Sequence, residues 1–196
     1  MEVTVTSRTA TSTWSIPKAL LSRYSKFFHV ACNGPFKEGQ KNKIVLPECN
    51  PKLFQLFVQW IYFNTISDNI DSEEDVWNAF RAWALGDRLM ASEFKNCIMK
   101  LLHETHAMDD PKHAEFADKE MVWCANNTMR GSRLQTWFID TLAQHWVYED
   151  YIKDDEEVWV LALDACPDLR TELLYKMVGM CKGEAEVKPL ATYLEE

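Results

Sequence analysis

The sequence lacks both a long hydrophobic run and a secretory signal. No apolar stretch approaches the roughly 20 residues that a membrane-spanning helix needs, because polar residues interrupt even the most apolar one, residues 53–66. The opening residues Met1-Glu2-Val3-Thr4 contain neither the basic nor the apolar segment of a signal peptide. We therefore expect an intracellular protein, in the cytoplasm or the nucleus, that makes no contact with a membrane.

The motifs of common metal and catalytic sites are also absent. Successive cysteines among the six are at least 15 residues apart, so no pair has the close spacing of zinc ligands. The sequence contains no glycine-rich phosphate loop and no Gly-x-Ser-x-Gly motif. We expect free, buried thiols, no cofactor and no enzymatic activity.

Basic charge is scarce in most of the chain. The net charge is −9, and residues 61–196 hold 13 Lys or Arg against 27 Asp or Glu. Residues 1–60 hold eight bases against three acids, but these bases are scattered. Because the acidic part would repel phosphates, the sequence argues against nucleic acid as a partner.

Hydrophobic periodicity predicts strands first and helices afterwards. Alternation of β-branched and aromatic residues with polar ones predicts short strands, which are residues 3–6, 13–16 and 43–46. A helix is expected after Pro17, where the first helical turn tolerates proline, and another over residues 26–31. From residue 50 the apolar spacing is helical, and residues 53–62 predict a central helix that is apolar nearly all round.

Capping patterns mark two of the later helices. Ser72 with Asp75, and Ser132 with Gln135, have the spacing of a capping box. Gly86 lies inside the first of these helices, where it costs about 1 kcal/mol. We expect close contact with a neighbouring backbone to be the reason for this glycine.

The order of these elements predicts an α+β domain followed by an all-helical extension. We place the domain at residues 1–106, where the chain becomes polar, and the helical extension at residues 107–183. Residues 184–196 are expected to fray.

Several segments together resemble the BTB/POZ domain. They are residues 16–21, 25–28, 34–39, 43–48, 54–62 and 85–89. The resemblance covers about residues 2–106, and residues 126–134 are similar to the helical tail of stand-alone fungal BTB proteins. It implies a small three-stranded sheet with a cluster of helices, and a role in protein–protein interaction without catalysis.

The resemblance also implies a candidate partner-binding segment. In BTB adaptors a hydrophobic-x-Glu motif contacts a cullin scaffold of a ubiquitin ligase, and Phe36, Lys37 and Glu38 occupy that place in a loop before the third strand. An aromatic anchor beside a charge is a common pairing in binding hot spots. The alternative is that Phe36 is tucked into the core and Glu38 is merely solvated. On a second alternative, the protein is a self-associating scaffold or a transcription-regulatory subunit without cullin contact.

The sequence departs from the family pattern in two places. Pro17 stands where the family usually has a histidine, although the following Lys18 is present. Many homodimeric members have an extra strand and helix before the first core strand. In this sequence the first core strand is already predicted at residue 3. A homodimer is possible, but we expect the usual two-fold interface to be largely missing.

Histidines and one cysteine invite other interpretations. His103 and His106 share a helix face, and with His113 they could supply metal ligands. Cys124 and His145 could formally act as a nucleophile and its base. We favour surface or interface histidines and a buried thiol, and we assign no metal or catalytic site.

Three aromatic residues border the acidic run of residues 149–157. They are Trp146, Tyr148 and Tyr151. They could form a partly exposed docking rim, whereas the alternative is a solvated acidic loop.

Overall fold

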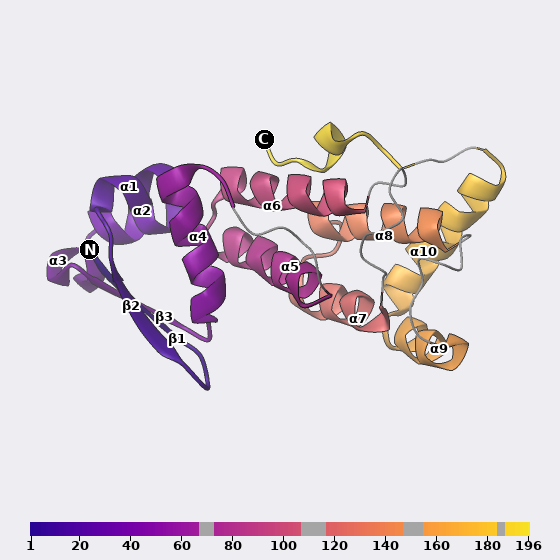
Figure 1. Cartoon of the computed structure of the whole chain (residues 1–196), viewed down its shortest axis with the longest axis horizontal. Coiled ribbons are helices and arrows are strands. Elements are labelled where there is room, and N and C mark those ends of the chain that lie inside the picture. Colours follow the sequence, from indigo (N-terminus) through magenta and orange to yellow (C-terminus); the bar gives the residue numbers. More distant parts are fainter. Residues whose placement is uncertain (67–72, 107–116, 147–154, 184–186) are drawn as a thin grey trace. The chain divides into compact units, whose positions relative to one another are not determined.

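The chain folds into a three-stranded sheet followed by helices, as the computed structural model shows for residues 1–66, 73–106, 117–146, 155–183 and 187–196. This arrangement confirms the predicted α+β class. The chain divides into two compact units, whose helices and strands are labelled in Figure 1. The N-terminal unit comprises Met1–Asp68, Arg81–Ile98 and Glu195–Glu196, and the C-terminal unit comprises Asn69–Phe80 and Met99–Leu194. Because helices α5 (Glu73–Arg88) and α6 (Ser92–Thr105) contribute to both units, the units differ in extent from the predicted domains, whose division stays a prediction.

The sheet has the strand order β2-β1-β3 and is mixed. The strands are β1 (Glu2–Thr6), β2 (Thr11–Ser15) and β3 (Lys43–Pro47). The central strand β1 is antiparallel to β2 and parallel to β3, with Val3 opposite Ile44. Val3, Val5, Ile44 and Leu46 are buried, whereas Val45 between them is exposed. One face of the sheet therefore covers the core, as the alternation predicted.

Four helices lie next to the strands in the N-terminal unit. They are α1 (Lys18–Tyr24), α2 (Lys26–Asn33), α3 (Lys37–Lys41) and α4 (Pro51–Phe63). The side chains of Ser25 and Asn50 cap α2 and α4 by accepting backbone hydrogen bonds. Helix α3 was not predicted, because its five residues contain no apolar periodicity. The candidate segment therefore lies at the start of a helix and not in a loop.

The core of the N-terminal unit is aromatic. Phe57 of α4 is fully buried, and its ring lies 6.2 Å from that of Phe28 and 5.3 Å from that of Phe94. Trp60 also contacts Phe94, at 5.5 Å. The contacts of Phe57 join helix α4 to α2 and to helix α6 (Ser92–Thr105), which explains why α4 is apolar on several sides.

Helices α5 (Glu73–Arg88) and α6 meet closely at Gly86. A Cβ atom on Gly86 would lie 2.8 Å from Cγ of Lys95 and 3.0 Å from Cδ1 of Phe94. Glycine is therefore needed at this position mainly because the side chains of α6 lie so close. The expected close contact was with a neighbouring backbone. The residue that was predicted to cap α5, Ser72, lies outside the described residues.

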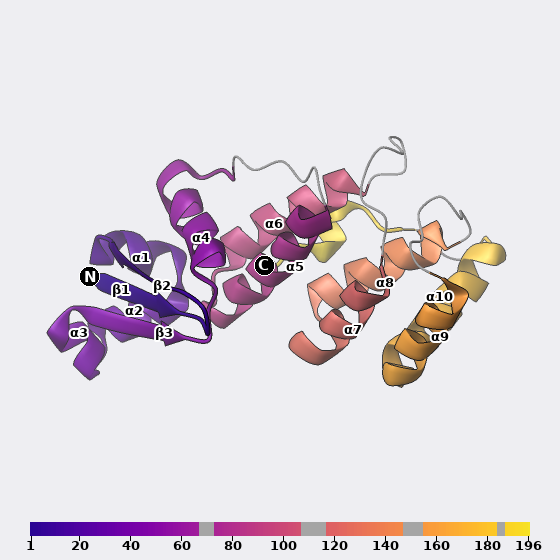
Figure 2. The same cartoon turned by 60° about the horizontal axis from the view of Figure 1, so that its bottom comes forward.

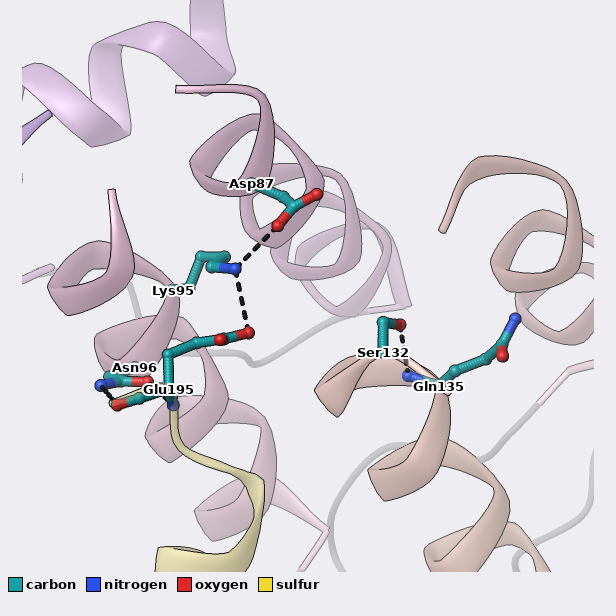
Figure 3. A network of polar contacts seen from close by, with 6 residues as sticks. All are labelled: Asp87, Lys95, Asn96, Ser132, Gln135 and Glu195. Atoms are coloured by element: carbon teal, nitrogen blue, oxygen red, sulfur yellow. Dashed lines mark hydrogen bonds and ion pairs between the residues drawn. The ribbon is translucent and has the colours of Figure 1, made fainter. Parts of the chain in front are cut away.

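Lys95 is the centre of a polar network in the N-terminal unit (Figure 3). Its side chain is only 8% exposed, and its ammonium lies 2.7 Å from Asp87 and 2.9 Å from Glu195. It also lies 4.7 Å from the centre of the Trp83 ring. Asn96 exchanges two hydrogen bonds with the backbone of Glu195, at 3.0 and 2.7 Å. A buried ammonium requires such partners, so Asp87 and Glu195 compensate its desolvation.

The C-terminal unit is helical and contains the remaining elements. They are α7 (Asp118–Asn127), α8 (Arg133–His145), α9 (Glu156–Ala165), α10 (Pro167–Cys181) and the 3₁₀ helix η2 (Leu190–Tyr193). Its core includes Phe80, whose ring contacts those of Trp123, Trp137 and Phe138. Ser132 accepts the predicted capping bond from the backbone of Gln135, at 3.3 Å (Figure 3). The Gln135 side chain accepts a 2.9 Å hydrogen bond from the backbone of Gly131, the residue before the N-cap, and not from Ser132 as in a capping box.

A buried carboxylate ties the C-terminal residues to this unit. Asp140 of α8 is fully buried, lies 2.5 Å from the ammonium of Lys176 in α10, and accepts a 3.0 Å hydrogen bond from the Tyr193 hydroxyl. Tyr193 is only 1% exposed, and its hydroxyl also accepts from the backbone of Lys188. The expectation that residues 184–196 fray is therefore wrong for residues 187–195, because buried side chains and backbone bonds hold them.

Candidate protein-interaction surface

The three candidate residues lie at the start of α3. Phe36 is the N-cap residue, and Lys37 and Glu38 form the first turn. The Phe36 side chain is 49% exposed, and Lys37 and Glu38 are exposed as well. The structure therefore does not place Phe36 in the core, and all three side chains face solvent from one short turn.

Helix α3 is held in place by contacts from α1 and α2. The ammonium of Lys18 donates a 2.9 Å hydrogen bond to the carbonyl of Gly39. A Cβ atom on Gly39 would lie 2.8 Å from the carbonyl oxygen of Cys32 and 3.0 Å from that of Ala31. Glycine therefore lets α3 approach the backbone of α2 closely. Lys18 is the residue of the family pattern that this sequence retains, and its observed contact is with α3.

Gly34 lets the backbone at the end of α2 and the Phe36 ring approach each other closely. A Cβ atom on Gly34 would lie 2.6 Å from the carbonyl oxygen of Val30 and 2.8 Å from Cδ2 of Phe36. Val30 is half exposed. Val30 was not predicted as a candidate, although its position two residues from Phe28 and from Cys32, which define the buried side of α2, indicates exposure. A helical residue two positions away from both faces the opposite side.

Replacing Gly39 by alanine is expected to lower the free energy of unfolding by about 2 kcal/mol, because the new methyl group meets backbone carbonyls that cannot turn away. Chemical denaturation of purified protein measures the change. Gln40, which is exposed in the same helix, gives the matched control Gln40→Ala, for which we expect less than about 0.5 kcal/mol. Equal stability of Gly39→Ala and wild type would show that α3 does not need its close contact with α2.

The comparison with known families identifies the fold on which this surface lies. Residues 2–97 match the family model of the BTB/POZ domain. The chain carries a BTB/POZ domain. A search of curated proteins finds no match. The match covers the three strands and helices α1 to α5, and BTB/POZ domains are protein–protein interaction modules.

The histidines of this BTB/POZ protein do not form a described metal site. His106 is buried, donates a 2.8 Å hydrogen bond from Nδ1 to the carbonyl of Leu102, and lies edge-on to Trp137. His103 contacts the Tyr193 ring, and burial lowers the pKa of its imidazole. The third histidine, His113, lies outside the described residues. Within the described ranges, no three His, Cys, Asp or Glu side chains could hold a metal ion.

Cys124 and His145 have environments that disfavour nucleophilic catalysis. Burial raises the pKa of the Cys124 thiol well above its usual range and lowers the pKa of the His145 imidazole to about 4. At neutral pH the thiol is protonated and the imidazole is neutral, whereas a catalytic cysteine needs a stabilised thiolate. These two buried residues therefore fit a packing role.

The structure also describes the remaining cysteines, and it describes Trp146 near the acidic run. All six cysteines are free, and four of them are buried, which leaves Cys97 half-buried and Cys181 exposed. Trp146 packs edge-on against Trp159 with the ring centres 5.0 Å apart. Tyr148 and Tyr151 lie outside the described residues, so the docking rim stays a prediction. None of the helices in the described ranges is both long and apolar enough to cross a membrane.

Proposed function

We propose that this BTB/POZ protein is a substrate adaptor that binds a cullin scaffold through Phe36, Lys37 and Glu38. The observation that carries the proposal is the half-exposed Phe36 beside the exposed Glu38 on a turn that other elements hold. In this role the BTB/POZ domain contacts the cullin, and another surface of the chain receives the protein to be ubiquitinated.

The geometry of α3 supports this proposal energetically. An exposed aromatic side chain offers a large apolar area that a partner pocket can bury, and aromatic residues are enriched in binding hot spots. Because Lys18 and Gly39 fix α3 before binding, little backbone entropy is lost on association. Val30 of α2 is a further half-exposed apolar residue of the N-terminal unit.

The test is a calorimetric titration of the full chain with the N-terminal domain of the BTB-binding cullin. We expect binding at micromolar affinity or tighter, and a loss of at least about tenfold, or 1.4 kcal/mol, in Glu38→Ala and in Phe36→Ala. Phe63, the last residue of α4, is 72% exposed. Phe63→Ala is therefore a control that removes an equally apolar, exposed ring elsewhere in the domain, and we expect it to bind like wild type.

Absence of binding heat with folded protein would remove the cullin role. The function would then be that of a self-associating scaffold or a regulatory subunit, and light scattering on the same samples measures the mass that distinguishes a dimer from a monomer. Binding that Phe63→Ala weakens as much as Phe36→Ala would also contradict the assignment to α3.

A further inference from the structure

Helices α9 and α10 expose an unusual amount of apolar side chain. Seven large apolar side chains are exposed in the described part of the C-terminal unit, and all but Met129 lie on these two helices. Tyr175 is 77% exposed and Leu161 is 71% exposed. Single exposed apolar residues are ordinary, but a group on adjacent helices marks an interaction site.

The exposed apolar residues lie on the sides of α9 and α10 that are opposite to the buried residues of each helix. Helix α9 packs against α7, α10 packs against α8, and α9 contacts α10. Figure 2 shows α9 and α10, in orange to yellow, side by side. Trp159 and Leu173 lie on the buried sides of their helices, and Leu161 and Tyr175 are each two residues further on. Two residues along a helix is a rotation of about 200°, so both side chains point away from the helices beneath.

Five residues therefore form what we call the outer face of the α9–α10 pair. They are Val160, Leu161, Leu174, Tyr175 and Val178. Helix α10 contributes three of them at the i, i+1, i+4 spacing of a single helix side. The helices of this unit pack on one another, and the outer face presents apolar residues where a further helix would pack.

The charges beside the outer face are acidic. Helix α9 carries Glu156, Glu157 and Asp164 and contains no lysine or arginine. The cations of α10 are already engaged, since Arg170 pairs with Asp164 and Lys176 pairs with the buried Asp140. A second copy of the chain would bring the same carboxylates against this face, whereas a cationic partner would neutralise them.

We propose that the outer face of α9 and α10 binds an amphipathic helix of a partner protein whose apolar side is flanked by lysine or arginine. The apolar side of that helix covers Leu161, Leu174 and Tyr175, and its cations meet Glu156 and Glu157. This is recognition of a helix by an apolar surface with complementary charge. It uses a surface separate from α3 and stands whether or not a cullin is bound.

The test measures binding of a designed fluorescent peptide to the full chain by anisotropy. The peptide forms about five helical turns, with leucines along one side and lysines on both flanks. We expect the double variant Leu174→Ser/Tyr175→Ser to weaken binding at least about tenfold. Met129 is 76% exposed in the same unit, so Met129→Ser is the matched control and is expected to bind like wild type.

A second arm tests charge. The double variant Glu156→Lys/Glu157→Lys is expected to weaken binding of the lysine peptide, and a peptide with glutamate in place of each lysine is expected not to bind wild type. Circular dichroism establishes that each variant is folded, which is expected because all substituted residues are exposed.

Three results would overturn the proposal. The first is equal affinity of the lysine peptide for wild type and for Leu174→Ser/Tyr175→Ser. The second is equal affinity of wild type for the lysine and glutamate peptides. The third is a dimer in sedimentation that Leu174→Ser/Tyr175→Ser dissociates, because the outer face would then serve a second copy of the chain.

Discussion

Asp140→Ala is expected to lower the free energy of unfolding by about 3 kcal/mol, because removal of one partner from a buried ion pair leaves the other partners unpaired. The carboxylate is fully buried and bridges α8, α10 and the segment after α10 through Lys176 and Tyr193. Its loss leaves the buried Tyr193 hydroxyl without its acceptor. The Lys176 side chain is about one-third exposed and regains some hydration, which keeps the cost at the lower end of the range for buried pairs.

Chemical denaturation of the full chain measures this loss, and Tyr193→Phe is the informative companion. It removes the two hydrogen bonds of the hydroxyl, to Asp140 and from the Lys188 backbone, and leaves the ion pair, so we expect a smaller loss of about 2 kcal/mol. The double variant should lose less unfolding free energy than the sum of the losses in the two single variants, because both residues belong to one network. Full additivity would show that the two residues act independently of each other, and a loss below about 1 kcal/mol for Asp140→Ala would show that the buried carboxylate does not stabilise the fold.

Acidification is expected to destabilise the protein through His145. The imidazole is 2% exposed, and burial lowers its pKa to about 4 from the usual 6.5. Between these values the unfolded chain binds a proton that the folded chain does not, so stability falls as the pH falls from 6.5 to about 4. A shift of this size corresponds to about 3 kcal/mol.

The measurement compares unfolding free energies of wild type and His145→Gln at several pH values. The variant lacks the titrating ring, so its stability should fall about 3 kcal/mol less than that of wild type between pH 7 and pH 4. The contribution of His145 is the difference in unfolding free energy between the two proteins. Wild type alone would not isolate it, because Glu120 is also buried. Burial raises the pKa of its carboxyl, and this group acts in the opposite direction, losing stability as the pH rises. Parallel curves for the two proteins would contradict the assignment to His145.

Elements with strong hydrophobic periodicity could be predicted from the sequence. The alternation around Val3 and Val5 marks a strand because those residues face the core, and the all-round apolar pattern of α4 reflects aromatic contacts on several sides. Helix α3 could not be predicted in this way. Its order depends on the Lys18 ammonium and on the backbone next to Gly39, which are contacts with other elements.

The assignment of Phe36, Lys37 and Glu38 as a binding surface stays a prediction, and the exposure of these residues could not be predicted from the sequence. A phenylalanine after Gly34-Pro35 has the same sequence signature whether it is buried or exposed, so the exposure of Phe36 required the structure. The packing of residues 187–195 against the rest of the chain could not be predicted for a similar reason. The partner of Tyr193 is Asp140, 53 positions away in the sequence, and no local pattern signals such a contact.

The pairing of β1 has a consequence for how the protein folds. A hairpin with β2 can form locally, but the parallel partner β3 begins at Lys43, after three intervening helices. Closing that long connection costs chain entropy before the β1–β3 hydrogen bonds form. We therefore expect the sheet to be completed only when α1 to α3 are in place. In hydrogen exchange, the β1 amides facing β3 should consequently be protected only as long as that whole unit stays folded.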